Sequence, residues 1–125
     1  MQLDENQMLK SILNAYPYPI IFIDNDYIIR YMNQYADYYY HKMRGYKNLI
    51  GKNMMDCHDY QSSKDKIVEY YNKMKSDGKS RFITVNMENQ RMYMQPVKNE
   101  KGEWIGFFER FELNLEMQIP FNMPR

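Results

Sequence analysis

The stretch from Leu49 to Gly78 constrains the fold most, because a polar, irregular segment runs there directly into one amphipathic helix. After Ser62, apolar side chains recur at helical spacing with Lys and Glu between them: Ile67, Tyr70, Tyr71 and Met74. We expect Ser62 to be the N-cap, answered by Asp65 as in a capping box, and Gly78 to end the helix. Strand-like sequence lies on both sides. A pocket is therefore expected where the irregular segment meets the helix.

The remaining elements are short and follow one another closely. A helix is predicted over 2–14, and two β-rich runs follow at 20–23 and 27–31, joined by the Asp24–Asn25–Asp26 turn of a hairpin. Asn33 is expected to cap a short helix over 34–43. Alternating patterns after Gly78 predict strands over 81–87, 91–97 and 104–113. This order favours an α+β fold: a five-stranded antiparallel sheet with helices packed on one face. The last strand, being the longest and most apolar, is expected at the centre beside the first.

A chain of 125 residues is expected to form one domain with one core. We expect an N-terminal helix over 1–14, the domain over 15–113, and a C-terminal tail or linker over 114–125. The net charge of +1 gives no support for a nucleic-acid or membrane-surface partner. A polar N-terminus, a single Cys and the lack of a long apolar run predict a cytoplasmic location.

Tyrosine and methionine are unusually frequent, with 13 and 12 copies. AT-rich codon usage would explain this composition. Alternatively, these side chains line a pocket, because thioethers and aromatic rings adapt to a guest molecule. Composition leaves both explanations open.

Several segments together resemble a PAS domain, over about residues 10–113. They are ILNAYPYPIIFIDNDYIIRYMNQYA, LIGKNMMD, the helix before Gly78, and MYMQPVKNEKGEWIGFFERFE. The resemblance is carried jointly by Asn33 after the second strand, the Ile50–Gly51–Lys52 step, and the P-V-x-x-x-x-G-x-x-I-G pattern that begins at Pro96. It implies a bacterial-type sensory or interaction module with a cavity between sheet and helices, and no catalysis.

Cofactor-binding PAS types leave marks that can be compared with this chain. In flavin-binding LOV domains a Cys follows Gly-x-Asn, and here Met54 stands in its place. Cys57 resembles the chromophore-bearing Cys of photoactive yellow protein, but residues 34–36 offer no Glu to pair with the chromophore. His58 lies just before the long helix, where it would be an iron ligand in a haem-binding PAS sensor. The sequence therefore leaves haem open as an alternative and does not identify a cofactor.

The sequence also bears on a metal site and on an enzymatic site. The run from Asp56 to Asp59 holds metal-ligating residue types, but neighbouring side chains diverge, so no metal site is predicted. A small cone-shaped enzyme of the ketosteroid-isomerase type would use an Asp or Tyr in an apolar setting. No such pair can be singled out in the sequence.

We therefore expect a sensory domain that binds a small, mostly apolar molecule non-covalently, contacts a signalling partner protein, or does both. Nine residues are the candidate lining of its pocket: Tyr31, Tyr35, Met54, Cys57, His58, Tyr70, Met92, Met94 and Phe107. A homodimer is also expected, built partly by an apolar stripe on the first helix, which consists of Leu3, Met8, Ile12 and Leu13.

Overall fold

The computed structural model describes residues 2–114. Its helices are α1 (Glu5–Ala15), α2 (Gln34–Asp37), the π-helix η1 (Tyr38–Met43), the 3-10 helix η2 (Met54–Cys57) and α3 (Gln61–Asp77). Its strands are β1 (Ile20–Asp24), β2 (Ile29–Met32), β3 (Arg81–Val85), β4 (Gln90–Lys98) and β5 (Trp104–Leu113). The predicted tail lies outside the described residues from 115 onward.

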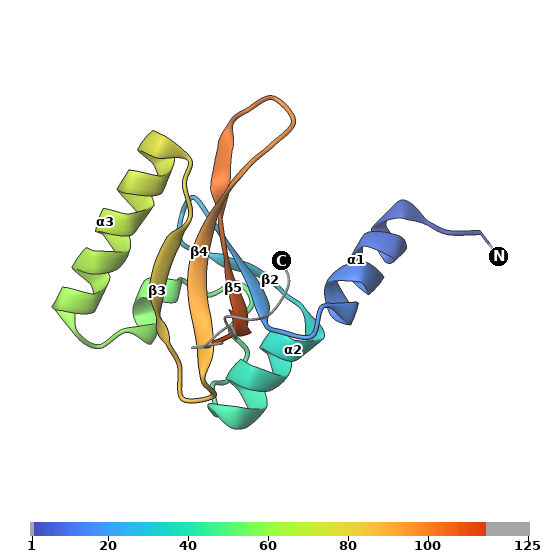
Figure 1. Ribbon diagram of the computed structural model, residues 1–125, viewed down its shortest axis with the longest axis horizontal. Coiled ribbons are helices and arrows are strands. Elements are labelled where there is room, and N and C mark those ends of the chain that lie inside the picture. The colour runs from blue at the N-terminus through green and yellow to red at the C-terminus, as the bar shows by residue number, and fades with distance from the viewer. Residues whose placement is uncertain (1, 115–125) are drawn as a thin grey trace, which may run out of the picture.

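The five strands form one antiparallel sheet in the order β2-β1-β5-β4-β3. β5 is central and pairs with β1 and β4, so both the predicted sheet and the place of its last strand are confirmed. In Figure 1, α3 runs along the sheet, while α1 projects away from it. The α+β architecture predicted from the sequence is therefore correct.

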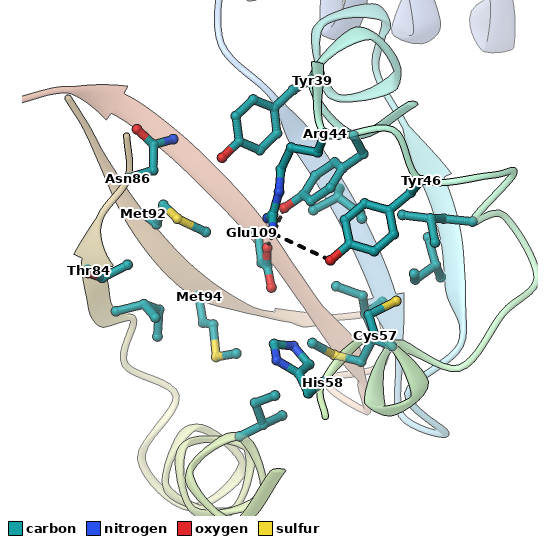
Figure 2. A pocket seen from close by; sticks show the side chains of 18 of the residues that line it. Tyr39, Arg44, Tyr46, Cys57, His58, Thr84, Asn86, Met92, Met94 and Glu109 are labelled. Carbon is teal, nitrogen blue, oxygen red and sulfur yellow. Dashed lines mark hydrogen bonds between the residues drawn. The ribbon is translucent and has the colours of Figure 1, made fainter. Parts of the chain in front are cut away.

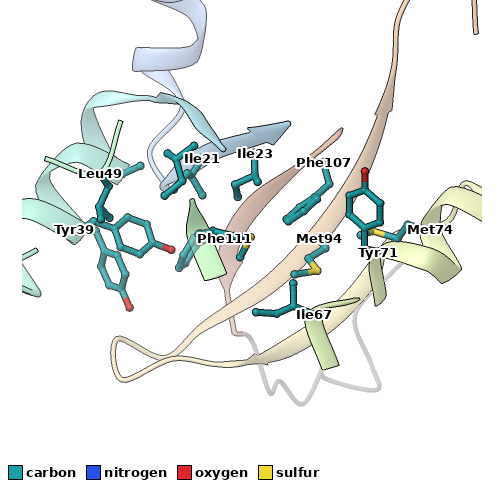
Figure 3. Packing of buried hydrophobic residues seen from close by; sticks show 14 residues of the cluster. Ile21, Ile23, Tyr39, Leu49, Ile67, Tyr71, Met74, Met94, Phe107 and Phe111 are labelled. Atoms are coloured by element: carbon teal, nitrogen blue, oxygen red, sulfur yellow. The ribbon is translucent and has the colours of Figure 1, made fainter. Parts of the chain in front are cut away.

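The hydrophobic core lies between one face of the sheet and the helices (Figure 3). Phe107 and Phe111 of β5 are completely buried, and Ile21 and Ile23 face the same side from β1. Met74 is the most deeply buried core residue of α3. Each such side chain contributes about 1.5–3 kcal/mol by leaving water. The alternation of apolar residues along β5 thus fixes which sheet face the helices cover.

The start of α3 differs from the prediction. Tyr60 is its N-cap and makes no side-chain capping bond, so the capping box of Ser62 and Asp65 is wrong. The Tyr60 carbonyl accepts from the amides of Ser63 and Lys64, which places Ser62 inside the first turn. Gly78 ends the helix as predicted, at φ +69° with its amide donating to the Met74 carbonyl at 2.7 Å.

Asn33 joins three segments at the edge of the core. Its Oδ1 accepts from the amides of Ile20 and Ala36, each at 2.9 Å. Its Nδ2 donates to the carbonyls of Leu13 and Tyr18 at 3.0 and 2.9 Å. The side chain is fully buried, so all four bonds are shielded from water. The predicted cap of the short helix is confirmed, and the same amide also ties α1 and β1 to it.

The hairpin between β1 and β2 is present, but β2 begins at Ile29 and not at residue 27. Asp24 Oδ1 accepts from the amides of Asp26 and Ile28, and Tyr27 adopts a positive φ of 65°. These bonds extend the turn by two residues.

Candidate functional site

A cavity of about 580 Å³ lies between the covered face of the sheet and the segment that includes η1, η2 and the start of α3 (Figure 2). Its buried base is apolar and consists of Ile21, Ile23, Ile29, Met54 and Met94. Exposed residues of the β3–β4 turn and of the η1 end also line it, namely Met87, Glu88, Met43 and Arg44. The cavity therefore opens to solvent between these two segments.

The segment around Gly51 fixes one wall of the cavity against the β1–β2 hairpin. The Gly51 amide donates to the Ile29 carbonyl at 2.7 Å, and the Ile29 amide donates to the Lys52 carbonyl at 2.9 Å. The Met54 amide then donates to the Tyr27 carbonyl at 2.8 Å. Asn53 caps η2 by accepting from the Met55 amide. These bonds hold Met54, Cys57 and His58 against the cavity.

The π-helix η1 turns two adjacent rings inward. Tyr39 and Tyr40 are both buried, whereas Tyr35 and Tyr38 are exposed. The inward rings are in edge contact, with centroids 4.9 Å apart. Tyr39 also packs against Phe111 at 5.4 Å. The pair forms an aromatic wall above the sheet.

Glu109 is the acidic residue at the interior of the cavity. It projects from β5 into the cavity (Figure 2). In the strand it stands between Phe107 and Phe111, which are buried on the covered face of the sheet. The Tyr40 hydroxyl donates to its Oε2 at 3.1 Å. Burial raises the pKa of this carboxyl, opposed by the Tyr40 hydrogen bond and by the charge of Arg44. The side chain is enclosed by protein, yet part of its surface faces the cavity.

Arg44 provides positive charge near the mouth. Its guanidinium lies over the rings of Tyr39, Tyr40 and Tyr46, at 5.9, 6.0 and 5.2 Å from their centroids. It also donates to the Tyr46 hydroxyl at 3.4 Å. Within residues 2–114, neither Arg44 nor another cation forms an ion pair with Glu109. The Arg44 guanidinium and the Glu109 carboxyl therefore line the same cavity without forming an ion pair.

Cys57 and His58 line the side of the cavity nearest η2. Burial, and next the charge of Asp56, raise the pKa of the Cys57 thiol, which therefore stays protonated and weakly nucleophilic. Burial, and next the charge of Arg44, lower the pKa of His58, which is therefore neutral at pH 7. In the described part of the chain the His58 ring makes no hydrogen bond.

Five of the nine candidate residues border the cavity: Met54, Cys57, His58, Met92 and Met94. The other four, Tyr31, Tyr35, Tyr70 and Phe107, do not. A β-bulge between Phe22 and Ile23 pairs Tyr31 with Phe22, on the opposite face of the sheet from Ile29. Tyr35 is exposed on α2.

Tyr70 and Phe107 do not reach the cavity because both pack in or beside the hydrophobic core. Tyr70 is half-buried at the edge of the core cluster. Phe107 has no exposed surface and packs against Tyr71, with ring centroids 6.4 Å apart. Both contribute to the core and not to the cavity wall.

Three prominent polar residues of the cavity were not among the candidates: Tyr40, Arg44 and Glu109. A signal for Glu109 was present, because it stands two residues from both Phe107 and Phe111 and so shares their face. No comparable signal marked Tyr40 among the tyrosines of its helix.

Across residues 2–114, no group of three or more His, Cys, Asp or Glu side chains is placed to hold a metal ion. Among the described helices, none has the length and apolarity that a bilayer crossing requires.

Comparison with known proteins gives a consistent result. A family model described as a PAS domain matches residues 9–112. A search of curated proteins found no match. A C-terminal domain from Streptococcus mutans shares the fold with a TM-score of 0.68 and 18% identity, over 90% of both chains. A sensory box sensor histidine kinase from Vibrio cholerae has a TM-score of 0.56 and 17% identity, over 86% of this chain and 90% of that one.

A third similar structure is VqmA of Vibrio cholerae bound to DPO. It has a TM-score of 0.58 and 13% identity, over 84% of this chain and 56% of that one. At these identities the structural matches establish a shared fold.

Proposed function

The chain belongs to the PAS domain family, and we propose that it is a sensory module that binds a small, mostly apolar molecule without covalent attachment. The observation that carries this proposal is the cavity of about 580 Å³, with its apolar base and few polar groups. The match to a sensor histidine kinase and to the DPO-bound VqmA supports a sensory role. The output passes to a signalling partner protein.

Binding is proposed to be non-covalent and without catalysis. The Cys57 thiol has a raised pKa, which disfavours a thioester or adduct. Met54 occupies the place of the LOV adduct cysteine. Family membership also leaves the alternative of a ketosteroid-isomerase-like enzyme without support. The cytoplasmic location expected from the sequence stays a prediction.

The test of the proposal is to block the cavity without disturbing the core. Val85 lines the cavity and is 39% exposed, so Val85→Trp should fill the mouth at little cost to folding. Phe82→Trp is the matched control, since Phe82 is exposed on the same strand and does not line the cavity. Native mass spectrometry and a thermal-shift screen of small apolar molecules would then be compared for the two variants and the wild type.

A guest present at 100 times its Kd stabilises the protein by about 2.7 kcal/mol. This stabilisation should appear in the wild type and in Phe82→Trp, and disappear in Val85→Trp. A broad screen without any stabilising molecule would leave the domain as an interaction module. An effect of equal size in all three proteins would place binding elsewhere.

Haem bound through His58 is the alternative. The neutral imidazole suits iron, but metal-ligating histidines are usually oriented by a hydrogen bond at the other ring nitrogen. His58 forms none with residues 2–114, so the geometry gives this version less support than the apolar guest. A Soret band in protein purified from its native host, lost in His58→Ala, would establish haem instead.

Self-association through α1 is also proposed. Of the predicted stripe, Leu3 precedes α1 and Leu13 is half-buried. Met8 and Ile12 are 39% and 59% exposed on the helix, and Leu9 adds a further apolar side chain at 47%. An apolar stripe of this kind marks an interaction surface. A second copy of the chain is the proposed partner, and the similar VqmA is described as a dimer.

The dimer can be tested by substitution on α1. Ile12→Glu should shift the sedimenting species to monomer, because it places a carboxylate in the apolar stripe. Gln7→Glu adds the same charge to a polar position of the same helix and should leave the mass unchanged. A monomeric wild type, or a dimer that survives Ile12→Glu, contradicts this interface.

A further inference from the structure

One carboxyl oxygen of Glu109 accepts a hydrogen bond from the protein, and the other accepts none from residues 2–114. Tyr40 donates to Oε2 at 3.1 Å, and no donor within the described residues reaches Oε1. Among the described residues, the Tyr31 hydroxyl is a side-chain atom that is both fully buried and without a hydrogen-bond partner. Oε1 of Glu109 is not such an atom. Oε1 therefore has accessible surface, and the cavity is the space that it faces.

Most other polar side chains of the cavity are already engaged. Asn86 Oδ1 accepts from the amides of Glu88 and Gln90, and its Nδ2 donates to the Gln90 side chain at 3.1 Å. The Tyr46 hydroxyl accepts from Arg44. The Tyr39 and His58 side chains form no hydrogen bond with residues 2–114, but Glu109 alone of the three is a carboxyl group fixed by a neighbouring tyrosine. It is the acceptor best placed to select a guest.

A carboxyl group in an apolar cavity is costly unless it is hydrogen-bonded on both oxygens. A guest that carries an N–H or O–H group would satisfy Oε1 as it fills the apolar space. A cationic guest would meet the Arg44 guanidinium, which lines the same cavity. An anionic guest would meet the carboxylate itself.

From this geometry we propose that Glu109 selects a neutral, mainly apolar guest that donates one hydrogen bond to its Oε1. The inference rests on the proposed function, because it assigns a chemical class to the molecule in that cavity. Tyr40 acts as a positioning residue that holds the opposite oxygen.

The test uses two probes of the same shape, indole and benzofuran, of which only indole has an N–H donor. Their dissociation constants for the full chain are measured by NMR titration. A hydrogen bond to the Glu109 carboxyl oxygen predicts that indole binds about tenfold more tightly than benzofuran. Glu109→Met keeps the length of the side chain and removes the acceptor, so the two probes should then bind equally.

Two further variants separate recognition from structure. Glu109→Gln keeps one acceptor oxygen, which the Tyr40 hydroxyl takes, and turns an amide N–H group toward the guest, so the preference for indole should be lost. Glu112→Met, on the opposite face of β5 and paired with Arg110, should leave the ratio of the two constants at the wild-type value. The ratio is informative because a merely structural role of Glu109 would weaken both probes together.

Equal affinities for both probes in the wild type would overturn the role of Glu109 while leaving the small-molecule cavity intact. A preference that survives Glu109→Met would overturn it as well. If neither probe binds at millimolar concentration, this inference fails, whereas the small-molecule function fails only if the broad thermal-shift screen also finds no guest. If both probes bind and only indole loses affinity in Glu109→Met, the assignment stands.

Discussion

Replacing Asn33 should be among the most destabilising single changes in this domain. The side chain forms four hydrogen bonds of 2.9–3.0 Å with backbone groups. At about 1 kcal/mol for each bond, Asn33→Ala should lower the free energy of unfolding by about 4 kcal/mol. That is a large part of the roughly 5–15 kcal/mol of a typical domain. The loss concerns α1, β1 and α2 together, because the partners come from all three.

Asn33→Asp separates the two halves of this network. Asp retains the oxygen that accepts from Ile20 and Ala36, but its second oxygen faces the carbonyls of Leu13 and Tyr18. This repulsion raises the pKa of the new carboxyl in the folded state. The variant should therefore lose stability as the pH rises through that raised value, and recover part of it in acid, where a protonated carboxyl again donates.

Urea unfolding from pH 4 to pH 8, followed by the fluorescence of the single Trp104, measures both effects. Asn25→Asp is the control for the added charge, since Asn25 is exposed in the β1–β2 turn. A loss below 1 kcal/mol in Asn33→Ala would refute the hydrogen-bond accounting. Stability of Asn33→Asp that increases with pH relative to the wild type would refute the assigned orientation of the amide.

Further predictions concern the cavity and the sheet. Because burial raises the pKa of Glu109, the wild type should lose stability relative to Glu109→Gln as the pH rises through that pKa, and urea titrations at several pH values check this. A wild type that gains stability relative to Glu109→Gln as the pH rises contradicts it. Tyr40→Phe removes a hydrogen bond that lowers the same pKa, so carbon-13 NMR of the Glu109 carboxyl should show a still higher value, and a lower one contradicts the contact. A Cβ at Gly106 would lie 2.2 Å from the Ile23 carbonyl oxygen, at a φ of +144°, so Gly106→Ala should lower the free energy of unfolding by more than about 3 kcal/mol. Gly102 has open space around it, so Gly102→Ala should lower it by about 1 kcal/mol. Equal losses in thermal unfolding would contradict the close approach of β1 and β5.

The sheet could be predicted from the sequence because period-two alternation is a local property of each strand. The central place of the 104–113 run follows from its length and apolar content, and its alternation puts Phe107 and Phe111 on one face. The position of Tyr31 could not be predicted in this way. The β-bulge opposite Phe22 places its side chain on the other face of the sheet, and no nearby residue in the sequence indicates a bulge. Ser62 shows a second limit, because Tyr60 starts α3 through backbone bonds alone.

The cavity was harder to predict than the fold. Met54, Cys57, His58, Met92 and Met94 were found because they lie in the irregular segment or on the alternating face of β4. Glu109 was not among the candidates, because a charged residue between Phe107 and Phe111 does not by itself indicate a cavity. It is in fact the position where that strand faces a space instead of a packed side chain.

The π-helix η1 makes chain length, as well as residue identity, a determinant of the cavity wall. A π turn holds about one residue more than an α turn, and such turns are frequent at functional sites. Here the π turn carries two consecutive rings that are both buried, Tyr39 and Tyr40. In a relative one residue shorter over 38–43, we expect the segment to wind as an α-helix and to present its side chains to the wall in a different register. A single alignment gap at this place would therefore change the volume and polarity of the chamber, even if every aligned residue were identical.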